Sequence, residues 1–179
     1  MTGIALTEAL LTLHGAGPIL ETAREVSRLL REAGLEGGII GGVATVLHGH
    51  VRTTLDVDVF VSGPTEAVGE ALRRHGFVFD AAERAFVKGG VPVHLVTIQQ
   101  TMSPPRHYEE IDAVRVVSLA DLINLKLRSG LANLLRAQDL ADVIGLIRAR
   151  ALGGDFAAKV DPALRAEFRR LADAVRAEP

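Results

Sequence analysis

Two aspartates near the middle of the chain, Asp56 and Asp58, are separated by a single valine. In a β-strand, alternate side chains share a face and advance about 3.3 Å per residue, so both carboxylates would project together. Two carboxylates about 6 Å apart repel by roughly 3 kcal/mol at an effective dielectric near 20. A divalent cation with a phosphate ligand would remove this repulsion, and Mg²⁺ is commonly held by one or two carboxylates plus substrate phosphates. The alternative is structural, since an isolated pair of this kind also occurs on the solvent-facing side of antiparallel strands.

A glycine pair, Gly41-Gly42, precedes the two aspartates and lies between an expected strand (38–40) and an expected helix (43–50). Glycine adopts positive φ and lets the backbone approach a ligand closely. Backbone N–H groups at the start of a helix attract phosphate. We therefore expect a phosphate-holding turn followed by a metal-holding strand, which together would form one nucleoside triphosphate site.

At these residues the chain resembles the minimal nucleotidyltransferase superfamily. The pattern is a hydrophobic-Gly-Gly turn, a helix, and a strand with Asp-hydrophobic-Asp, found here as Ile40-Gly41-Gly42 and Asp56-Val57-Asp58-Val59. Arg52-Thr53-Thr54, just before the strand, is similar to the Arg-x-Thr of that superfamily. The resemblance covers roughly residues 37–150. It implies an α/β (α+β) fold, with a small mixed β-sheet flanked by helices and followed by C-terminal helices.

The resemblance also implies an activity. A nucleoside monophosphate would move from an NTP, such as ATP, to an acceptor hydroxyl, with Mg²⁺ held by Asp56 and Asp58. Gly41, Gly42, Arg52 and Thr54 would bind the nucleotide. The acceptor is left open between RNA such as tRNA, a protein and a small molecule. A catalytically degenerate protein that only binds is the alternative.

A later lysine, Lys126, is followed by Arg136, Asp139 and Asp142 in the spacing Arg-x-x-Asp-x-x-Asp. This arrangement is similar to the abortive-infection and toxin-type branch of the superfamily. That branch implies a further alternative, the toxin component of a toxin–antitoxin module that modifies RNA and has an antitoxin partner.

Lys126 is one of only three lysines in the chain and lies on or beside the apolar stripe of an expected helix. One interpretation is structural, with the stem buried and the ammonium in water. The other places the ammonium near the triphosphate or the two aspartates, where a compact charge stabilises phosphate.

Asp139 and Asp142 border the apolar side of the next expected helix. That side carries three apolar residues: Leu135, Val143 and Leu146. Carboxylates on a packed face need strong partners, and an i+3 pair with Arg136 contributes only about 0.2–0.5 kcal/mol. We therefore expect these aspartates to orient Lys126 or Arg136, or to help place the acceptor.

His94 stands in the expected strand 91–98, where the resemblance implies a third acidic ligand. Imidazole is a poor ligand for Mg²⁺, which prefers oxygen. Since imidazole titrates near neutral pH, His94 would suit a general base for the acceptor hydroxyl. A neutral histidine satisfied within the sheet is the competing interpretation.

Composition fits one well-buried domain, because the 179 residues are 48% hydrophobic and 23% charged. The net charge of −2 gives no overall positive field for nucleic-acid binding, and the absence of cysteine excludes disulfides and thiolate metal sites. No basic leader or membrane-length apolar run is visible in the sequence. We therefore expect a cytoplasmic protein without membrane contact.

Periodicity and turn residues predict an α/β core over 1–117 and a helical segment over 118–179 packed on it as one compact unit. The expected helices before residue 118 are 4–13, 18–33, 43–50 and 64–74. The expected strands are 38–40, 55–61, 77–79, 85–88, 91–98 and 111–117. Residues 99–110 are expected to be irregular.

Overall fold

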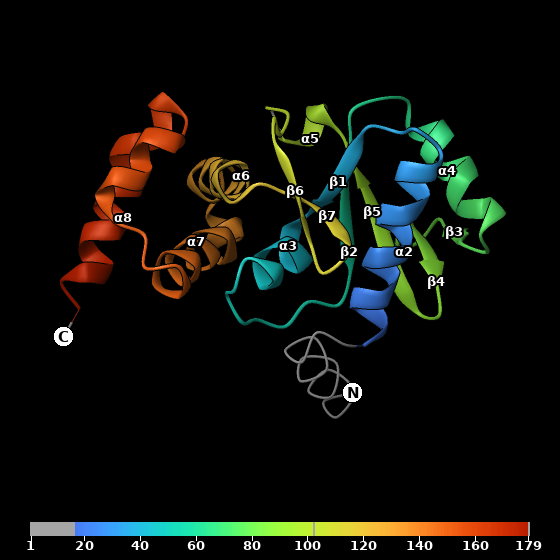
Figure 1. Cartoon of the computed structure of the whole chain (residues 1–179), viewed down its shortest axis with the longest axis horizontal. Helices are drawn as coiled ribbons and strands as arrows, with labels where there is room; N and C mark the ends of the chain where they lie inside the picture. Colours follow the sequence, from blue (N-terminus) through green and yellow to red (C-terminus); the bar gives the residue numbers. More distant parts are fainter. Residues whose placement is uncertain (1–16, 102, 179) are drawn as a thin grey trace.

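The computed structural model describes residues 17–101 and 103–178, so the helix expected at 4–13 lies outside the described part (Figure 1). The described residues form a seven-stranded mixed sheet in the order β3-β4-β5-β2-β1-β7-β6. Its strands are β1 Gly37–Ile40, β2 Val57–Val61, β3 Val78–Asp80, β4 Ala85–Lys88, β5 Val91–Val96, β6 Tyr108–Ile111 and β7 Val114–Val117. The helices are α2 Pro18–Glu32, α3 Gly41–Leu47, α4 Thr65–Arg74, α5 Ile98–Thr101, α6 Leu119–Ala132, α7 Ala137–Ala149 and α8 Arg165–Arg176. Three 3₁₀ turns join the C-terminal helices: η1 Leu134–Arg136, η2 Gly154–Lys159 and η3 Pro162–Leu164.

The centre of the sheet brings the informative strands together. β2 runs antiparallel to β1 and parallel to β5. The register places Asp58 opposite Ile40 on one side and His94 on the other. Because paired residues on neighbouring strands project from the same face, Asp58 and His94 share a face of the sheet.

The opposite face of β2 packs on helices. α2 contacts β7, β1, β2 and β5, and α4 lies against α2. Val57, Val59 and Val61 alternate towards this layer and are buried, as the strand pattern predicts. Alternation along the expected strand 55–61 also directs Leu55 towards the core, and this was wrong, because Leu55 precedes β2 and is 57% exposed.

The C-terminal helices gather on the other side of the sheet from α2 and α4, with α8 farthest away (Figure 1). α6 packs against α7, and α7 packs against α8. The Ser118 hydroxyl caps α6 by accepting a hydrogen bond from the Asp121 N–H at 3.2 Å. α6 also contacts α3, so the helical segment reaches the glycine turn after β1.

Two segments differ from the sequence prediction. The single strand expected at 111–117 is a hairpin of β6 and β7, turned by Asp112 and Ala113 at φ 50° and 61°. The pattern missed this turn because alanine, unlike glycine, rarely adopts positive φ. The segment 99–110 is not wholly irregular, since α5 begins at Ile98 and β6 begins at Tyr108.

The helix expected at 43–50 begins earlier, at Gly41, and ends at Leu47. Both glycines therefore lie in its first turn and not in a separate loop. Over residues 17–101 and 103–178, no helix combines the length and the apolar character needed to cross a bilayer.

Candidate functional site

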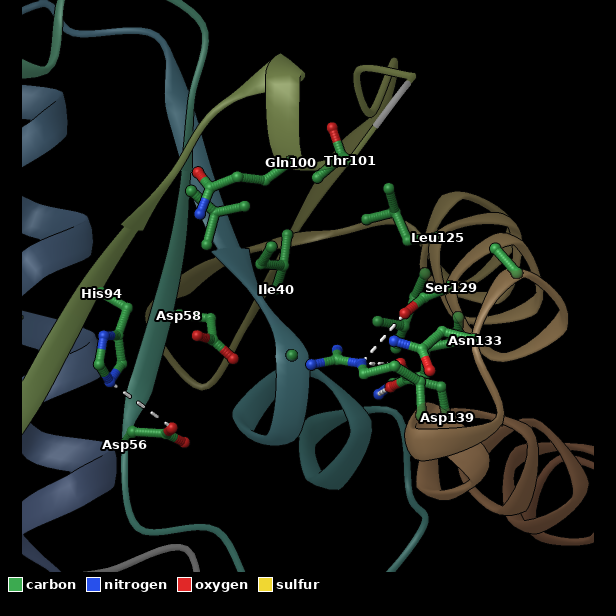
Figure 2. Close-up of a pocket in the computed structure, with 16 residues that line it drawn as sticks. Ile40, Asp56, Asp58, His94, Gln100, Thr101, Leu125, Ser129, Asn133 and Asp139 are labelled. Carbon is green, nitrogen blue, oxygen red and sulfur yellow. Dashed lines mark hydrogen bonds and ion pairs between the residues drawn. The ribbon is translucent and has the colours of Figure 1, made fainter. Parts of the chain in front are cut away.

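A cavity of about 580 Å³ opens between the centre of the sheet and the corner where α6 meets η1. Figure 2 shows His94, Asp56 and Asp58 on one side of it and Ser129, Asn133 and Asp139 on the other. Apolar side chains, Ile40 and Leu125 among them, complete its lining. The cavity therefore has an acidic wall from the sheet and a mixed polar wall from the helices.

The acidic wall is built by two carboxylates in different environments. Asp56 lies in the bend just before β2 and is 42% exposed at its side chain; its Oδ1 accepts a hydrogen bond from Thr54 Oγ1 at 3.2 Å. Asp58 lies within β2, and no donor among the described residues hydrogen-bonds its carboxylate. Burial, and then the neighbouring charge of Asp56, raise the pKa of Asp58 above its ordinary value.

Gly41 lies directly against Asp58. Its φ is 65°, and a Cβ added there would be 2.0 Å from Asp58 Oδ2. Gly42 has a different neighbour, since a Cβ on it would be 2.3 Å from Thr54 Oγ1. Only glycine allows both approaches. Gly41 lines the cavity, whereas Gly42 and Thr54 stand behind it and support the bend that carries Asp56.

His94, on β5, lines the same wall beside Asp58 of β2. Its Nε2 lies 3.9 Å from Asp56 Oδ2. Its place on the neighbouring strand is the one that the sequence analysis expected for a third ligand. Across the described ranges, no group of three or more His, Asp or Glu side chains is arranged to hold a metal. The chain itself thus offers two carboxylates for a cation.

Those two carboxylates fit Mg²⁺. Both supply the hard oxygen ligands that Mg²⁺ prefers. Asp58 accepts no hydrogen bond from the described residues, and burial disfavours its charged form. Mg²⁺ usually keeps several waters and takes only one or two protein carboxylates, with substrate phosphates as further ligands. A two-carboxylate wall beside an open cavity meets this requirement.

Lys126 is neither solvated nor close enough to pair with Asp56 or Asp58. Its side chain is buried, and Nζ donates to Asp139 Oδ1 at 3.1 Å and to Asp142 Oδ2 at 2.6 Å. The interpretation that placed this ammonium in water was therefore wrong. Lys126 lines the same cavity as Asp56 and Asp58, and its proximity to a bound triphosphate stays a prediction. The expectation that the two aspartates orient Lys126 agrees with these contacts.

Each of these aspartates has further partners. Burial by itself would raise their pKa values, but the charge and hydrogen bonds of Lys126 outweigh it, so the pKa of each lies below its ordinary value. Asp142 also accepts from Arg52 Nη1 at 2.7 Å and from Gln138 Nε2 at 2.9 Å. Asp142 is completely buried and does not line the cavity, so it contacts Lys126, Arg52 and Gln138 and not the cavity space.

Arg52 likewise lies outside the cavity lining, because its guanidinium is held by Asp142. The expectation that Leu135 belongs to the packed face of α7 was wrong. Leu135 is 93% exposed because it lies in η1, where the 3₁₀ turn rotates it away from the helices. Val143 and Leu146 are buried, as expected.

Arg136 is a cavity residue that the sequence analysis did not include among the site residues. Its Nε donates to Asp139 Oδ2 at 2.9 Å and to Ser129 Oγ at 3.1 Å. The Arg-x-x-Asp spacing was the available signal, but spacing alone predicts only a weak i+3 pair. The corner between α6 and η1, which directs the side chain into the cavity, becomes visible only in the structure.

No protein-family model and no curated protein matches the chain. Solved structures do. One is an antigenic nucleotidyltransferase-like protein from Paracoccidioides brasiliensis, with a TM-score of 0.54 and 18% identity over 88% of this chain and 92% of that one. Another is an H. pylori protein described as a nucleotidyltransferase, with a TM-score of 0.54 and 14% identity over 98% of this chain and 96% of that one. At such identities the similarity shows the fold alone, and it confirms the fold prediction.

Proposed function

From this nucleotidyltransferase-like fold, we propose that the chain moves a nucleoside monophosphate from an NTP to an acceptor hydroxyl. The single observation that carries the proposal is the acidic wall. Asp56 and Asp58 lie side by side on a cavity, and the backbone of Gly41 lies so close to Asp58 that no side chain fits between them. Asp58 is shielded from water and accepts no hydrogen bond from the described residues, so its charge opposes folding unless a cation binds beside it.

Asp56 and Asp58 would hold Mg²⁺, which when bound would neutralise charge on the phosphate oxygens of the NTP. The hydrogen bond from Thr54 fixes the Asp56 carboxylate, and the tight approach of Gly41 leaves the Asp58 carboxylate little freedom to turn. Preorganisation of this kind matters because catalysis of phosphoryl transfer is almost entirely positioning and electrostatic stabilisation.

In the transfer, the acceptor oxygen forms a bond to the α-phosphorus. The bond from that phosphorus to the bridging oxygen breaks, and pyrophosphate leaves with the bonding electrons. The acceptor proton must go to a base, and His94 lines the cavity next to both aspartates. His94 would take this proton, because its position on the cavity, 3.9 Å from Asp56, favours the general-base interpretation over that of a satisfied sheet residue.

Thermal stabilisation by each NTP with Mg²⁺ tests the site. Asp58→Ala should abolish the stabilisation, whereas Asp173→Ala, which removes an exposed acid on α8, should leave it unchanged. Equal stabilisation of wild type and Asp58→Ala would contradict the proposal.

Incubation with α-labelled NTPs and cell extract separates an enzyme from a binding protein. A labelled RNA, protein or small molecule identifies the acceptor class and supports transfer. Binding without any labelled product would instead favour the degenerate binder, for which the histidine at position 94 is the motivating observation.

The toxin role remains a prediction from the resemblance in α6 and α7. Growth arrest on expression, relieved by Asp56→Ala, would support it. Normal growth during expression of folded protein would contradict it.

A further inference from the structure

We propose that Arg136 is the cation that binds the polyphosphate of the NTP. The guanidinium lies on the wall opposite Asp56 and Asp58, and its Nε is fixed by Asp139 and Ser129. This inference rests on the proposed function and assigns to Arg136 the phosphate contact that one of the two interpretations of the sequence gave to Lys126.

The ammonium of Lys126 already has two carboxylate partners. It is buried and donates to them at 3.1 and 2.6 Å. Turning it towards a phosphate would leave Asp139 and Asp142 buried with their main partner removed, which is strongly unfavourable. Lys126 therefore lines the cavity with an ammonium that is already committed to two carboxylates and cannot turn to a phosphate without breaking those contacts.

Arg136 is in the opposite situation. Its single Nε–H is used by the anchor, while the four N–H groups on its two terminal nitrogens make no hydrogen bond to any residue in the described ranges. The side chain is 59% exposed, so phosphate would not have to displace a buried partner. A guanidinium held at Nε presents its remaining donors as a planar fork, which matches two oxygens of a phosphate.

Charge balance favours the same residue. The cluster on this wall consists of three cations and two carboxylates: Arg52, Lys126, Arg136, Asp139 and Asp142. One positive charge is left over, and Arg136 is the cation of the three that is both exposed and on the cavity. It is also close enough to Asp58 to lower the pKa of that acid, although no ion pair within 4.0 Å forms between them. A polyphosphate bound in the cavity would thus have Mg²⁺, held by Asp56 and Asp58, on one side and the Arg136 guanidinium on the other.

Inorganic tripolyphosphate is the probe of choice, because it carries the phosphate chain without requiring knowledge of the base. Calorimetry with Mg²⁺ present would measure its dissociation constant, and that of each NTP, for wild type, Arg136→Gln and Arg136→Lys. The matched control is Arg148→Gln, which removes an arginine that pairs with Glu178 far from the cavity lining.

Arg136→Gln should weaken tripolyphosphate and NTP binding on the order of 10- to 100-fold, the effect of losing charge-assisted hydrogen bonds to phosphate. Arg148→Gln should bind as wild type does. Arg136→Lys should resemble Arg136→Gln more than wild type, because lysine lacks the Nε anchor and its ammonium would be drawn to Asp139.

Three results would overturn the inference. Wild-type affinity in Arg136→Gln would show that another group binds the phosphates, while the proposed function would stand. Wild-type affinity in Arg136→Lys would show that the anchored fork is irrelevant. Wild-type protein that binds neither NTP nor tripolyphosphate would refute the proposed function together with the inference.

Discussion

Gly41→Ala would show whether the position of the Asp58 carboxylate, which we propose binds Mg²⁺, matters apart from the strain that the substitution places on the backbone. The φ of Gly41 is 65°, and the new Cβ would be 2.0 Å from Asp58 Oδ2. Ordinary van der Waals contact begins at 3.4 Å, so the carboxylate oxygen must retreat by about 1.4 Å. The Cγ of Asp58 is also within 2.8 Å of the added atom, so turning the carboxylate about its last bond does not relieve the clash.

Gly34→Ala provides the control, because Gly34 has φ 64° and no atom within 4 Å of an added Cβ. In both variants the left-handed backbone should cost about 1–2 kcal/mol of unfolding free energy. For a chain of this length that loss corresponds to a melting temperature lowered by about 2–8 °C. The free-energy cost of the left-handed backbone is therefore the same in both variants, and the comparison removes it.

The transfer rates of the two variants then measure the effect of displacing the Asp58 carboxylate. Misplacement by about 1 Å costs on the order of 100-fold in rate, so Gly41→Ala should lose about that factor and Gly34→Ala should keep wild-type rates. Single-turnover transfer of labelled nucleotide, alongside urea denaturation, would measure both quantities. A Gly41→Ala protein with normal transfer, or a Gly34→Ala protein equally defective, would refute the reasoning.

Three further substitutions test the charged groups. Lys126→Met leaves Asp139 and Asp142 buried with only arginine and neutral partners, so urea denaturation should show a loss of about 3 kcal/mol; a loss below 1 kcal/mol would count against the buried cluster. Asp142 has a lowered pKa in the folded state, so its stabilisation is present at neutral pH and is lost as pH falls below its ordinary 3.8. Asp142→Asn should therefore be destabilising at pH 7 and progressively less so as the pH falls below 3.8, and a difference that stays constant down to the acid transition would be the contrary result. Asp58 has a raised pKa, so its ionised form opposes folding at neutral pH. Asp58→Asn should unfold at higher urea than wild type at pH 7 with chelator present, and the gap should close as the pH approaches 3.8.

Several features of the site could be predicted from local sequence. The Asp-Val-Asp alternation placed both carboxylates on one face, because side chains alternate along a strand and Val57 and Val59 had to face the core. The glycine pair indicated a close approach of the backbone to a phosphate, which stays a prediction; the close approaches that the structure shows are to the side chains of Asp58 and Thr54. The expected strands 85–88 and 91–98 leave only Gly89 and Gly90 between them, and the structure joins β4 to β5 there by a hairpin with positive φ at both glycines.

Other features were out of reach of local patterns. The turn between β6 and β7 contains Asp112 and Ala113 at positive φ, and no glycine or proline in the sequence indicated a turn there. The partner of Arg52 lies 90 residues away at Asp142, and no periodicity connects a loop before β2 with α7. Leu135 looked like a core residue in the helical pattern, but a 3₁₀ turn exposed it.

The sequence by itself placed Asp56 and Asp58 together on one side of the chain at β2 and indicated a close backbone approach at the glycine pair, because strand alternation and glycine conformation act over a few neighbouring residues. Only the tertiary structure decided which charged side chains are buried in ion pairs and which face the cavity. Folding α6 and α7 together buried Lys126 between two carboxylates and left Arg136 facing the cavity. That division depends on which groups lose water when distant helices pack, and the order of residues along one helix does not encode it.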